Sequence, residues 1–298
     1  IQNTLTNNML KFWGSPQLQA SWLPRLAADT VASFCLSEAG SGSDAFALRT
    51  TAELRGDHYV LNGEKMWISN SQEAGVFLVM ATVDPSLRHR GITSFVVPRE
   101  SDGLEVGARQ PMMGLRASSN CPVSFTDVKV PRENVLGEVG HGYKYAIEIL
   151  NEGRIGIGAQ MLGIARGVIE ATMPYLHTRE QFGRCVADFQ AMQHQLARLH
   201  MEMESVRLLV YNAARLREAG RPCVKEAAMA KLAASELAER AASQCINWAG
   251  GIGFTSDFGI EKFYRDAKVG QIYEGTSNIQ LNTIGKLVSN DVRQKHGL

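Results

Sequence analysis

The sequence predicts an α+β protein in which an antiparallel β-sheet or barrel domain precedes a domain of long helices. Residues 31–139 alternate short β-branched runs with turn residues, and no segment between these runs is long enough for a crossover helix. From about residue 140 onward the chain is rich in Ala and Leu, and apolar residues recur at helical spacing. We therefore expect a helical remnant at residues 1–28, a middle β domain at 29–139 and a four-helix-bundle-like domain at 140–298.

Local patterns place the expected strands and helices. Asn62-Gly63 is a dipeptide typical of tight hairpin turns, and the runs on either side of it are β-rich, so we expect a hairpin there. Further strands are predicted at residues 76–83, 92–97 and 123–130. Long helices are predicted at residues 142–173, ended by Pro174, at 189–218 and at 224–248.

The charge balance and the cysteines narrow the class of protein. The 298 residues carry 31 basic and 30 acidic side chains, a net charge of +1, and no long block of like charge. Nucleic acid is therefore not an expected partner. The five cysteines and seven histidines lack the spacings of zinc ligands, so we expect free thiols in an intracellular compartment and no metal site.

The N-terminus starts abruptly. Apolar residues at Ile1, Leu5 and Met9 indicate the end of a helix, and the first residues resemble neither a signal peptide nor a transit peptide. We therefore expect that an N-terminal portion is missing, together with any targeting signal. No apolar run approaches the length of a membrane span, so no span is expected.

Near the C-terminus, Glu274 is followed by Gly275 and by a helix-start signal. Ser277 and Gln280 form the S-x-x-Q capping pattern, and apolar residues then recur at helical spacing, so a helix is expected to begin at about Ser277. Gly275 lets a ligand approach the backbone, and the free N–H groups of a helix start can hold a polar group. A solvated surface glutamate is the alternative interpretation.

Two segments of the predicted β domain are also candidate ligand contacts. Residues 34–44 join a short apolar strand to a loop rich in glycine and hydroxyl groups, which can offer backbone N–H groups to a ligand. This loop matches neither the lysine-containing phosphate loop nor the nucleophile elbow, and a plain turn is the alternative. Trp67 and Ser69 can contact a planar ring by packing and hydrogen bonding, although a strand tryptophan also suits a core.

Three features of the helical half suggest ligand contact as well. Gly153 lies inside a predicted helix, where glycine costs about 1 kcal/mol relative to alanine, and either a close approach or helix packing explains it. Arg179 and Gln190 bracket a loop and can hold a phosphate, with a surface arginine as the alternative. Residues 248–253 contain three glycines after a helix, which fits a helix C-cap and not a dinucleotide fingerprint.

Taken together, these segments resemble the acyl-CoA dehydrogenase family, whose members use FAD to introduce a trans double bond between the α and β carbons of an acyl-CoA thioester. The resemblance covers essentially the whole chain and rests on FCLSEAGSGSD, MWIS, LNEGRIGIGAQMLGIARG, TREQFG, DFQ, WAGGIGF and YRDAKVGQIYEGTSNIQ. Two stretches, LNEGRIGI and IYEGTSNIQLNTI, look most like the members that act on short or 2-methyl-branched acyl chains.

The resemblance implies contacts with both FAD and the acyl-CoA substrate. The residues implied to contact FAD are Phe34, Cys35, Leu36, Ser37, Gly42, Ser43, Trp67, Ile68, Ser69, Arg179, Gln190, Asn247, Trp248, Ala249, Gly250, Gly251, Thr276, Ser277 and Asn278. Those implied to contact the acyl-CoA are Ser43, Tyr143, Asn151, Glu152, Gly153, Arg154 and Gly275. In the family a neighbouring subunit holds the adenine end of FAD, so Arg179, Gln190 and residues 247–251 are implied to act across a dimer interface.

The resemblance also implies that Glu274 is the catalytic base. Some relatives carry the base at the position of Gly153, where a glycine cannot serve. Glu274 would remove the α-proton while the β-hydride passes to flavin N5, and hydrogen bonds from the Glu274 N–H and an FAD ribityl hydroxyl would stabilise the enolate. We expect the helix start to hold the pKa of Glu274 down until bound acyl-CoA raises it.

The family further implies electron transfer to an electron-transferring flavoprotein, a mitochondrial matrix location and a homotetramer arranged as a dimer of dimers. This chain departs from the family pattern in two places. The resemblance implies that most of the N-terminal helical domain is missing from this sequence. Arg88-His89-Arg90 replaces the loop in which the branched-chain member has a substrate-contacting tyrosine, which leaves the role of His89 open. Two alternatives are an acyl-CoA oxidase that uses oxygen and a truncated, non-catalytic helical scaffold.

Overall fold

The structure is a computed structural model that describes residues 2–297. These residues form two compact units. The first comprises the residues up to 112 together with 116–150, and the second comprises 113–115 together with the residues from 151 onward. Helix α3 (Gly142–Thr178) begins in the first unit and continues in the second.

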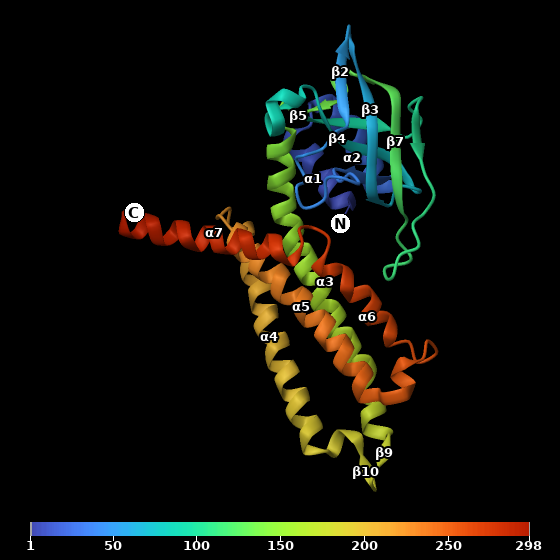
Figure 1. Cartoon of the computed structure of the whole chain (residues 1–298), viewed down its shortest axis with the longest axis vertical. Helices are drawn as coiled ribbons and strands as arrows, with labels where there is room; N and C mark the ends of the chain where they lie inside the picture. The colour runs from blue at the N-terminus through green and yellow to red at the C-terminus, as the bar shows by residue number, and fades with distance from the viewer. Residues whose placement is uncertain (1, 298) are drawn as a thin grey trace. The chain divides into compact units, whose positions relative to one another are not determined.

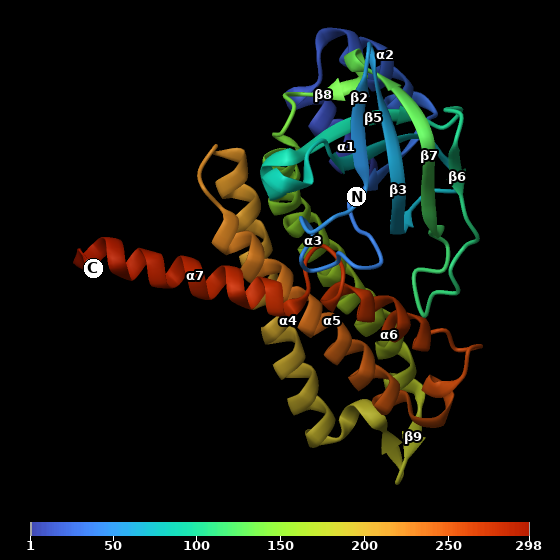
Figure 2. The same ribbon diagram turned by 45° about the horizontal axis from the view of Figure 1, so that its top comes forward.

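The first unit is built on an eight-stranded sheet with the strand order β6–β7–β3–β2–β4–β5–β8, and β1 pairs with β4 (Figures 1 and 2). Neighbouring strands are mostly antiparallel, as the sequence predicts, whereas β1 and β2 are each parallel to β4. The strands are β1 (Val31–Cys35), β2 (Thr51–Arg55), β3 (His58–Ser69), β4 (Ala74–Thr82), β5 (Ile92–Pro98), β6 (Leu104–Val106), β7 (Asn120–Pro131) and β8 (Val135–Leu136).

Two buried apolar clusters hold the first unit together. One contains residues of helices α1 (Gln2–Trp13) and α2 (Pro16–Ala28) together with Leu78 of β4, and Phe77 of the same strand belongs to the other. Successive side chains of a strand point to opposite faces of the sheet. Strand β4 is therefore buried on both faces, which explains why its sequence is almost continuously apolar.

The prediction of a hairpin turn at Asn62-Gly63 is wrong. Strand β3 runs without reversal from His58 to Ser69, and the turn lies instead between β2 and β3, where Arg55 pairs with His58. Gly63 occupies an irregularity in the pairing of β3 with β7, with a φ of +145°. A Cβ there would lie 2.7 Å from the Thr50 Cα, so glycine is required by close backbone approach and not by chain reversal.

The second unit is a bundle of long helices. Its elements are the later turns of α3, the helices α4 (Gln190–Glu218), α5 (Val224–Ala249), α6 (Glu261–Lys268) and α7 (Ser277–His296), and the short strands β9 (Glu180–Gln181) and β10 (Arg184–Cys185). Helix α5, drawn in orange in Figure 1, contacts α4, α6 and α7. Its buried face is mostly alanine, for example Ala234, Ala238 and Ala241, and the distance between packed helices falls when the contacting side chains are small.

The prediction that the helix ends at Pro174 is also wrong, because α3 continues through this proline to Thr178. Proline lacks the N–H that would bond to the carbonyl of the residue four positions earlier. That residue is Glu170, which is exposed, so water can satisfy the free carbonyl. The hydroxyl of Thr178 donates to the Pro174 carbonyl at 3.2 Å and continues the turn.

The five cysteines are all free thiols in the structure, as the sequence predicts. Among residues 2–297, no helix has both the length and the apolar character needed to cross a membrane.

Candidate active site

Helix α7 begins at Ser277, as predicted, but its cap differs from the expected one. Thr276 is the N-cap, and its hydroxyl accepts a hydrogen bond from the Ile279 N–H at 3.3 Å. The hydroxyl of Ser277 is buried and has no hydrogen-bond partner within the described part of the chain. The Gln280 side chain does not complete a capping box, because it donates to the carbonyls of Glu274 at 3.1 Å and Gly275 at 2.9 Å.

The backbone of Glu274 and Gly275 is left-handed at both residues, with φ values of +54° and +85°. A left-handed glutamate is uncommon, and such conformations persist only where the surroundings enforce them. Two side chains supply that enforcement. Gln280 donates to both carbonyls, and Lys231 of α5 donates from Nζ to the Gly275 carbonyl at 2.7 Å.

The carboxylate of Glu274 faces Gly153 of α3. A Cβ built at Gly153 would lie 3.0 Å from Oε2 of Glu274 and 3.4 Å from Oε1. The sequence left two explanations for this glycine, close approach or helix packing, and the structure shows the close approach of a carboxylate. The Oε2 atom is buried and has no hydrogen-bond partner among the described residues, which excludes the interpretation of Glu274 as a solvated surface residue.

Burial raises the pKa of Glu274 to about 7, against the opposing charges of Arg154 and Lys231, which lower it. The expectation that the helix start holds this pKa down is therefore wrong. Desolvation of the carboxylate outweighs the favourable charges before any substrate is bound. The same burial lowers the pKa of Lys231 to about 8 and lowers the pKa of Arg154, while the charge of Glu274 opposes both shifts.

The neighbours of Gly153 on α3 have structural partners of their own. Arg154 donates from Nη1 to Oδ1 of Asn151 at 3.0 Å, and its Nε is buried without a partner in the described structure. Glu152 forms an ion pair with Arg217 of α4. Of the substrate contacts implied on this helix, Gly153 lies against the Glu274 carboxylate and Arg154 acts on it through its charge, whereas Glu152 joins α3 to α4.

In the first unit, the structure brings residues 34–37 and 67–69 together. The Ser33 hydroxyl donates to the Ser69 carbonyl at 2.8 Å, and the Met66 N–H donates to the Ser37 carbonyl at 2.9 Å. Side chains of Phe34, Cys35 and Leu36 are buried beside this junction. The glycine-rich loop that follows is open, since a Cβ at Gly40 or Gly42 would meet no atom within 4 Å.

Trp67 is the exposed member of this group. It lies at an irregularity in the pairing of β3 with β7, has a φ of +63° and is 53% exposed. The alternative of a core tryptophan is therefore wrong. Ile68 is buried and Ser69 is half-buried, so the strand offers one flat aromatic surface beside polar backbone.

A buried ion pair that sequence reasoning missed anchors the loop at residues 36–38. Lys65 of β3 is fully buried and donates to Oε1 of Glu38 at 2.8 Å and to the Leu36 carbonyl at 3.1 Å. Glu38 also accepts from the N–H groups of Arg49 and Thr50 at 2.7 and 3.0 Å. The only sequence signal was a lysine within a predicted strand, which local patterns assign to a solvated face.

Tyr143, in the first turn of α3, lies with His89 and Phe46 in the first unit. The rings of His89 and Tyr143 make an edge contact with centroids 4.6 Å apart, and those of Phe46 and Tyr143 are 5.9 Å apart. His89 and Phe46 also line a cavity of about 350 Å³ in this unit, which Asp44 and Arg88 border. Ser43, next to Asp44, is exposed.

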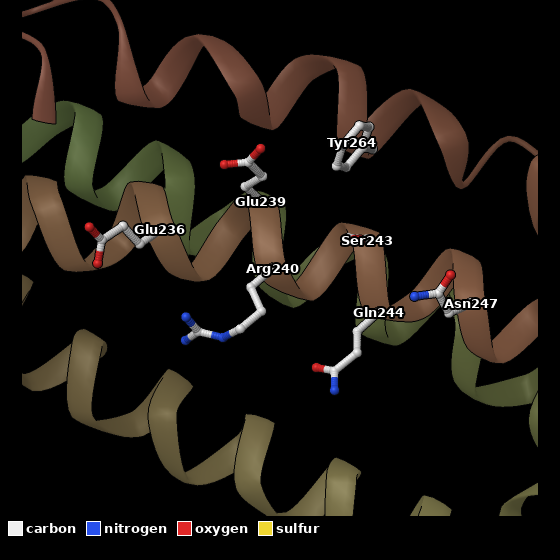
Figure 3. Close-up of a pocket in the computed structure, with 7 residues that line it drawn as sticks. All are labelled: Glu236, Glu239, Arg240, Ser243, Gln244, Asn247 and Tyr264. Atoms are coloured by element: carbon white, nitrogen blue, oxygen red, sulfur yellow. The ribbon is translucent and has the colours of Figure 1, made fainter.

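The residues implied to act across a subunit interface lie on the second unit. Arg179 and Gln190 are both exposed and flank the β9–β10 hairpin. Asn247 lines a cavity of about 390 Å³ with Arg240 and other polar residues of α5 and with Tyr264 of α6, whose side chains Figure 3 shows.

The end of α5 forms the expected helix C-cap at Gly250, which has a φ of +69°. Trp248 is buried, and its indole N–H donates to Oε1 of Gln195 at 2.9 Å, so its side chain is committed to packing against α4. Ala249 is buried too, whereas Gly251 is exposed. At the start of α7, Asn278 is exposed.

The comparisons with known proteins agree with this arrangement. The acyl-CoA dehydrogenase middle domain matches residues 33–128, and the acyl-CoA dehydrogenase C-terminal domain matches residues 140–288. The mitochondrial short/branched chain specific acyl-CoA dehydrogenase of Bos taurus is 57% identical over 289 residues. The alignment covers 97% of this chain and 67% of the bovine protein, so the chain spans about two thirds of that relative.

Solved structures are similar as well. Butyryl-CoA dehydrogenase from Megasphaera elsdenii superimposes with a TM-score of 0.94 at 36% identity, covering 96% of this chain and 75% of that one. A glutaryl-CoA dehydrogenase from Mycobacterium smegmatis in complex with FADH2 gives a TM-score of 0.92 at 31% identity, covering 97% of this chain and 74% of that one.

The family matches, together with the residues around Glu274 and those beside Trp67, define the class of protein as an FAD-dependent oxidoreductase. More narrowly, the chain belongs to the acyl-CoA dehydrogenase family. The residues of the first unit fit the cofactor: the exposed face of Trp67 suits a planar ring, and the open glycine loop leaves room for a ligand at the backbone.

Proposed function

We propose that this protein dehydrogenates short or 2-methyl-branched acyl-CoA thioesters at the α and β carbons, with Glu274 as the base that removes the α-proton. The observation that carries the proposal is the state of the Glu274 carboxylate. Its Oε2 atom is buried, has no partner among the described residues and faces a glycine. Burial raises its pKa to about 7, which suits a base that works near neutral pH.

The chemistry of the chain's own residues follows from that position. The thioester carbonyl acidifies the α-C–H, and the buried carboxylate accepts this proton without first having to break a hydrogen bond. Arg154 and Lys231 keep positive charge near the carboxylate, which limits the rise of its pKa and keeps a useful fraction ionised at neutral pH. The Glu274 N–H is proposed to donate to the thioester oxygen and stabilise the enolate.

FAD, when bound, supplies the acceptor for the β-hydride at its N5 atom. We propose that Trp67 and Ser69, with the backbone of residues 34–37 and the loop at Gly42 and Ser43, hold the flavin ring. Thr276, Ser277 and Asn278 are proposed to contact FAD as well. Arg179, Gln190 and the exposed residues Asn247, Gly250 and Gly251 are proposed to hold the adenine end of a partner subunit's FAD.

Substrate contacts are proposed for both units. Tyr143 and Ser43 would contact the CoA part, and Asn151, Gly153, Arg154 and Gly275 would surround the acyl carbons next to Glu274. The proposed preference for short or branched chains is supported by the identity of 57% to the bovine enzyme, whose name specifies short/branched chains, and the 2-methyl position of the branch is proposed from the resemblance alone. We propose that His89 contacts substrate from the cavity it lines in the first unit.

The partners and setting follow from the family. We propose an electron-transferring flavoprotein as electron acceptor, a homotetramer arranged as a dimer of dimers, and the mitochondrial matrix as the location. The mitochondrial part rests on the names of the relatives alone.

An anaerobic titration tests the proposed function. FAD-loaded protein is mixed with a panel of straight and 2-methyl-branched acyl-CoAs, and bleaching of the flavin absorbance is recorded. We expect the fastest and most complete bleaching with short and 2-methyl-branched chains. Absence of bleaching by every acyl-CoA would contradict the proposal and favour the non-catalytic scaffold, as would purified protein that cannot take up FAD.

A second measurement separates the dehydrogenase from an oxidase. Protein reduced by acyl-CoA is exposed either to oxygen or to an artificial dye acceptor, and the rate of flavin reoxidation is compared. A dehydrogenase reoxidises much faster with the dye. Equal or faster reoxidation by oxygen supports the acyl-CoA oxidase instead.

A further inference from the structure

Lys231 of α5 is a buried cation placed beside the candidate base. The residue is fully buried, and its Nζ donates to the Gly275 carbonyl at 2.7 Å. Within the described part of the chain, the Lys231 ammonium group forms no ion pair with a carboxylate. A buried lysine is costly unless its charge interacts with something, so this one requires an explanation.

The hydrogen bond of Lys231 reaches the backbone at the point where it is strained. Glu274 and Gly275 are both left-handed, and the Gly275 carbonyl accepts from Lys231 and from Gln280. Ser235, one helical turn further along α5, donates to the Gly270 carbonyl at 2.8 Å. Helix α5 therefore holds the segment that carries Glu274 at two points, and Lys231 bonds to the residue directly after Glu274.

The charge of Lys231 also acts on that carboxylate. Two cations of the described chain act electrostatically on Glu274, Arg154 from α3 and Lys231 from α5, and Tyr273 is the neighbouring ionisable group. Burial raises the pKa of Tyr273, so this side chain is neutral at physiological pH. Arg154 has a hydrogen bond to Asn151 on its own helix, whereas Lys231 bonds directly to the residue after Glu274.

We propose that Lys231 is a positioning residue for the α-proton base, holding the left-handed Glu274-Gly275 backbone through the Gly275 carbonyl and keeping the carboxylate ionised through its charge. The inference rests on the proposed function, because it concerns the same reaction. It assigns to one side chain two separable effects, a geometric one and an electrostatic one. Gln280 shares the first effect and lacks the second, which makes it a matched control.

The test compares Lys231→Met with Gln280→Met in FAD-loaded protein. Both variants lose a donor to the Gly275 carbonyl, Gln280→Met also loses the donor to the Glu274 carbonyl, and only Lys231→Met loses a charge. We expect both to lower kcat, about tenfold or more, because small displacements of a catalytic group are costly, with KM little changed. Only Lys231→Met is expected to move the acidic limb of the pH profile of kcat upward, by about one pH unit.

Two further measurements keep the test decisive. If Lys231→Met does not retain FAD, Lys231→Gln replaces it, because glutamine is polar yet uncharged and the same upward shift is expected. Amide hydrogen exchange of residues 270–276 is measured in the absence of substrate, and about tenfold faster exchange is expected in either Lys231 variant.

The outcomes are distinct. Unchanged exchange and an unchanged pH profile in the Lys231 variants would overturn the inference, and so would an equal shift of the acidic limb in Gln280→Met. If no acyl-CoA bleaches the flavin of the wild-type protein, the proposed function fails. The amide hydrogen-exchange rates alone then show whether Lys231 holds residues 270–276 in place.

Discussion

Gly153 lies directly against the carboxylate of Glu274: a Cβ at Gly153 would be 3.0 Å from Oε2 and 3.3 Å from Cδ. This contact joins the two positions at which the resemblance implies that a base can stand, one inside α3 and one in the segment before α7. One is occupied by glycine, and the space its missing side chain leaves is filled by the glutamate from the other. Because the two residues are in contact, a side chain added at Gly153 is expected to displace the Glu274 carboxylate and lower the rate of the reaction.

Replacement of Gly153 by alanine is expected to separate stability from activity. The new Cβ crowds the carboxylate by a few tenths of an ångström, and we expect kcat to fall about tenfold. Alanine also favours the helix by about 1 kcal/mol, which offsets the crowding, so the thermal midpoint should change little. The matched control is Gly163→Ala, also in α3, where a Cβ meets no atom within 4 Å. It should gain stability and keep activity, and a parallel loss of activity in both variants would contradict this explanation.

The pH dependence of turnover should report the buried carboxylate. Glu274 works as a base only when ionised, and burial raises its pKa to about 7. We therefore expect kcat/KM to fall about tenfold per pH unit below that value. Stopped-flow bleaching of the flavin between pH 5 and pH 9 measures this profile. A flat profile down to pH 5 would show that the carboxylate is not held in the desolvated state that the structure shows.

Stability should depend on pH through the same group. Because the pKa of Glu274 is about 7 in the folded protein and 4.5 for an ordinary glutamate, the folded protein binds one more proton than the unfolded chain between these values. Stability from this group is fully present below pH 4.5 and is lost as the pH rises through about 7. Glu274→Gln does not titrate, so it should be more stable than wild type at pH 8, by up to about 3 kcal/mol. Denaturant unfolding at pH 8 and pH 4 checks this, since the difference should nearly vanish at pH 4.

The buried pair Glu38–Lys65 should be essential for the loop that is proposed to hold flavin. Lys65→Met leaves the Glu38 carboxylate buried without its cation, which costs about 3–5 kcal/mol. We expect a lower thermal midpoint and weaker retention of FAD, measured by the flavin-to-protein ratio after gel filtration. Replacing both partners, with Glu38→Gln added, should restore much of the stability. As a control, Arg55→Met removes the exposed pair with Glu53 and should leave the midpoint and the FAD content unchanged.

The arrangement of strands and helices could be predicted because it follows from periodicity, which is a local property. The order of a β unit and a helical unit, most strand positions and the start of α7 at Ser277 all come from patterns within a dozen residues. The wrong predictions, at Gly63 and Pro174, lie where contacts with residues outside the local pattern determine the backbone conformation. Gly63 is a glycine because of the Thr50 backbone and not because of a turn, and Pro174 is tolerated because the carbonyl it leaves free belongs to the exposed Glu170.

The position of the candidate base, Glu274, could be predicted from its sequence motif. The burial of its carboxylate could not be predicted in this way. Nothing in the residues beside Glu274 indicates that its carboxylate is buried, because burial comes from α3, more than a hundred residues away in sequence. Lys231 and Lys65 were overlooked for the same reason. A lysine in an alanine-rich helix or in a strand is usually solvated, and only the three-dimensional structure shows the carbonyl and carboxylate groups that these two side chains bind.

The most direct test of the central claim is the reaction of FAD-loaded Glu274→Gln protein with a short or 2-methyl-branched acyl-CoA under anaerobic conditions. Glutamine has nearly the same shape and cannot accept the α-proton. We predict that the variant still takes up FAD and still binds the acyl-CoA, seen as a perturbed flavin spectrum, while the rate of flavin bleaching falls by about 10²–10⁴-fold. Bleaching at the wild-type rate would show that another group removes the proton, and would contradict the account.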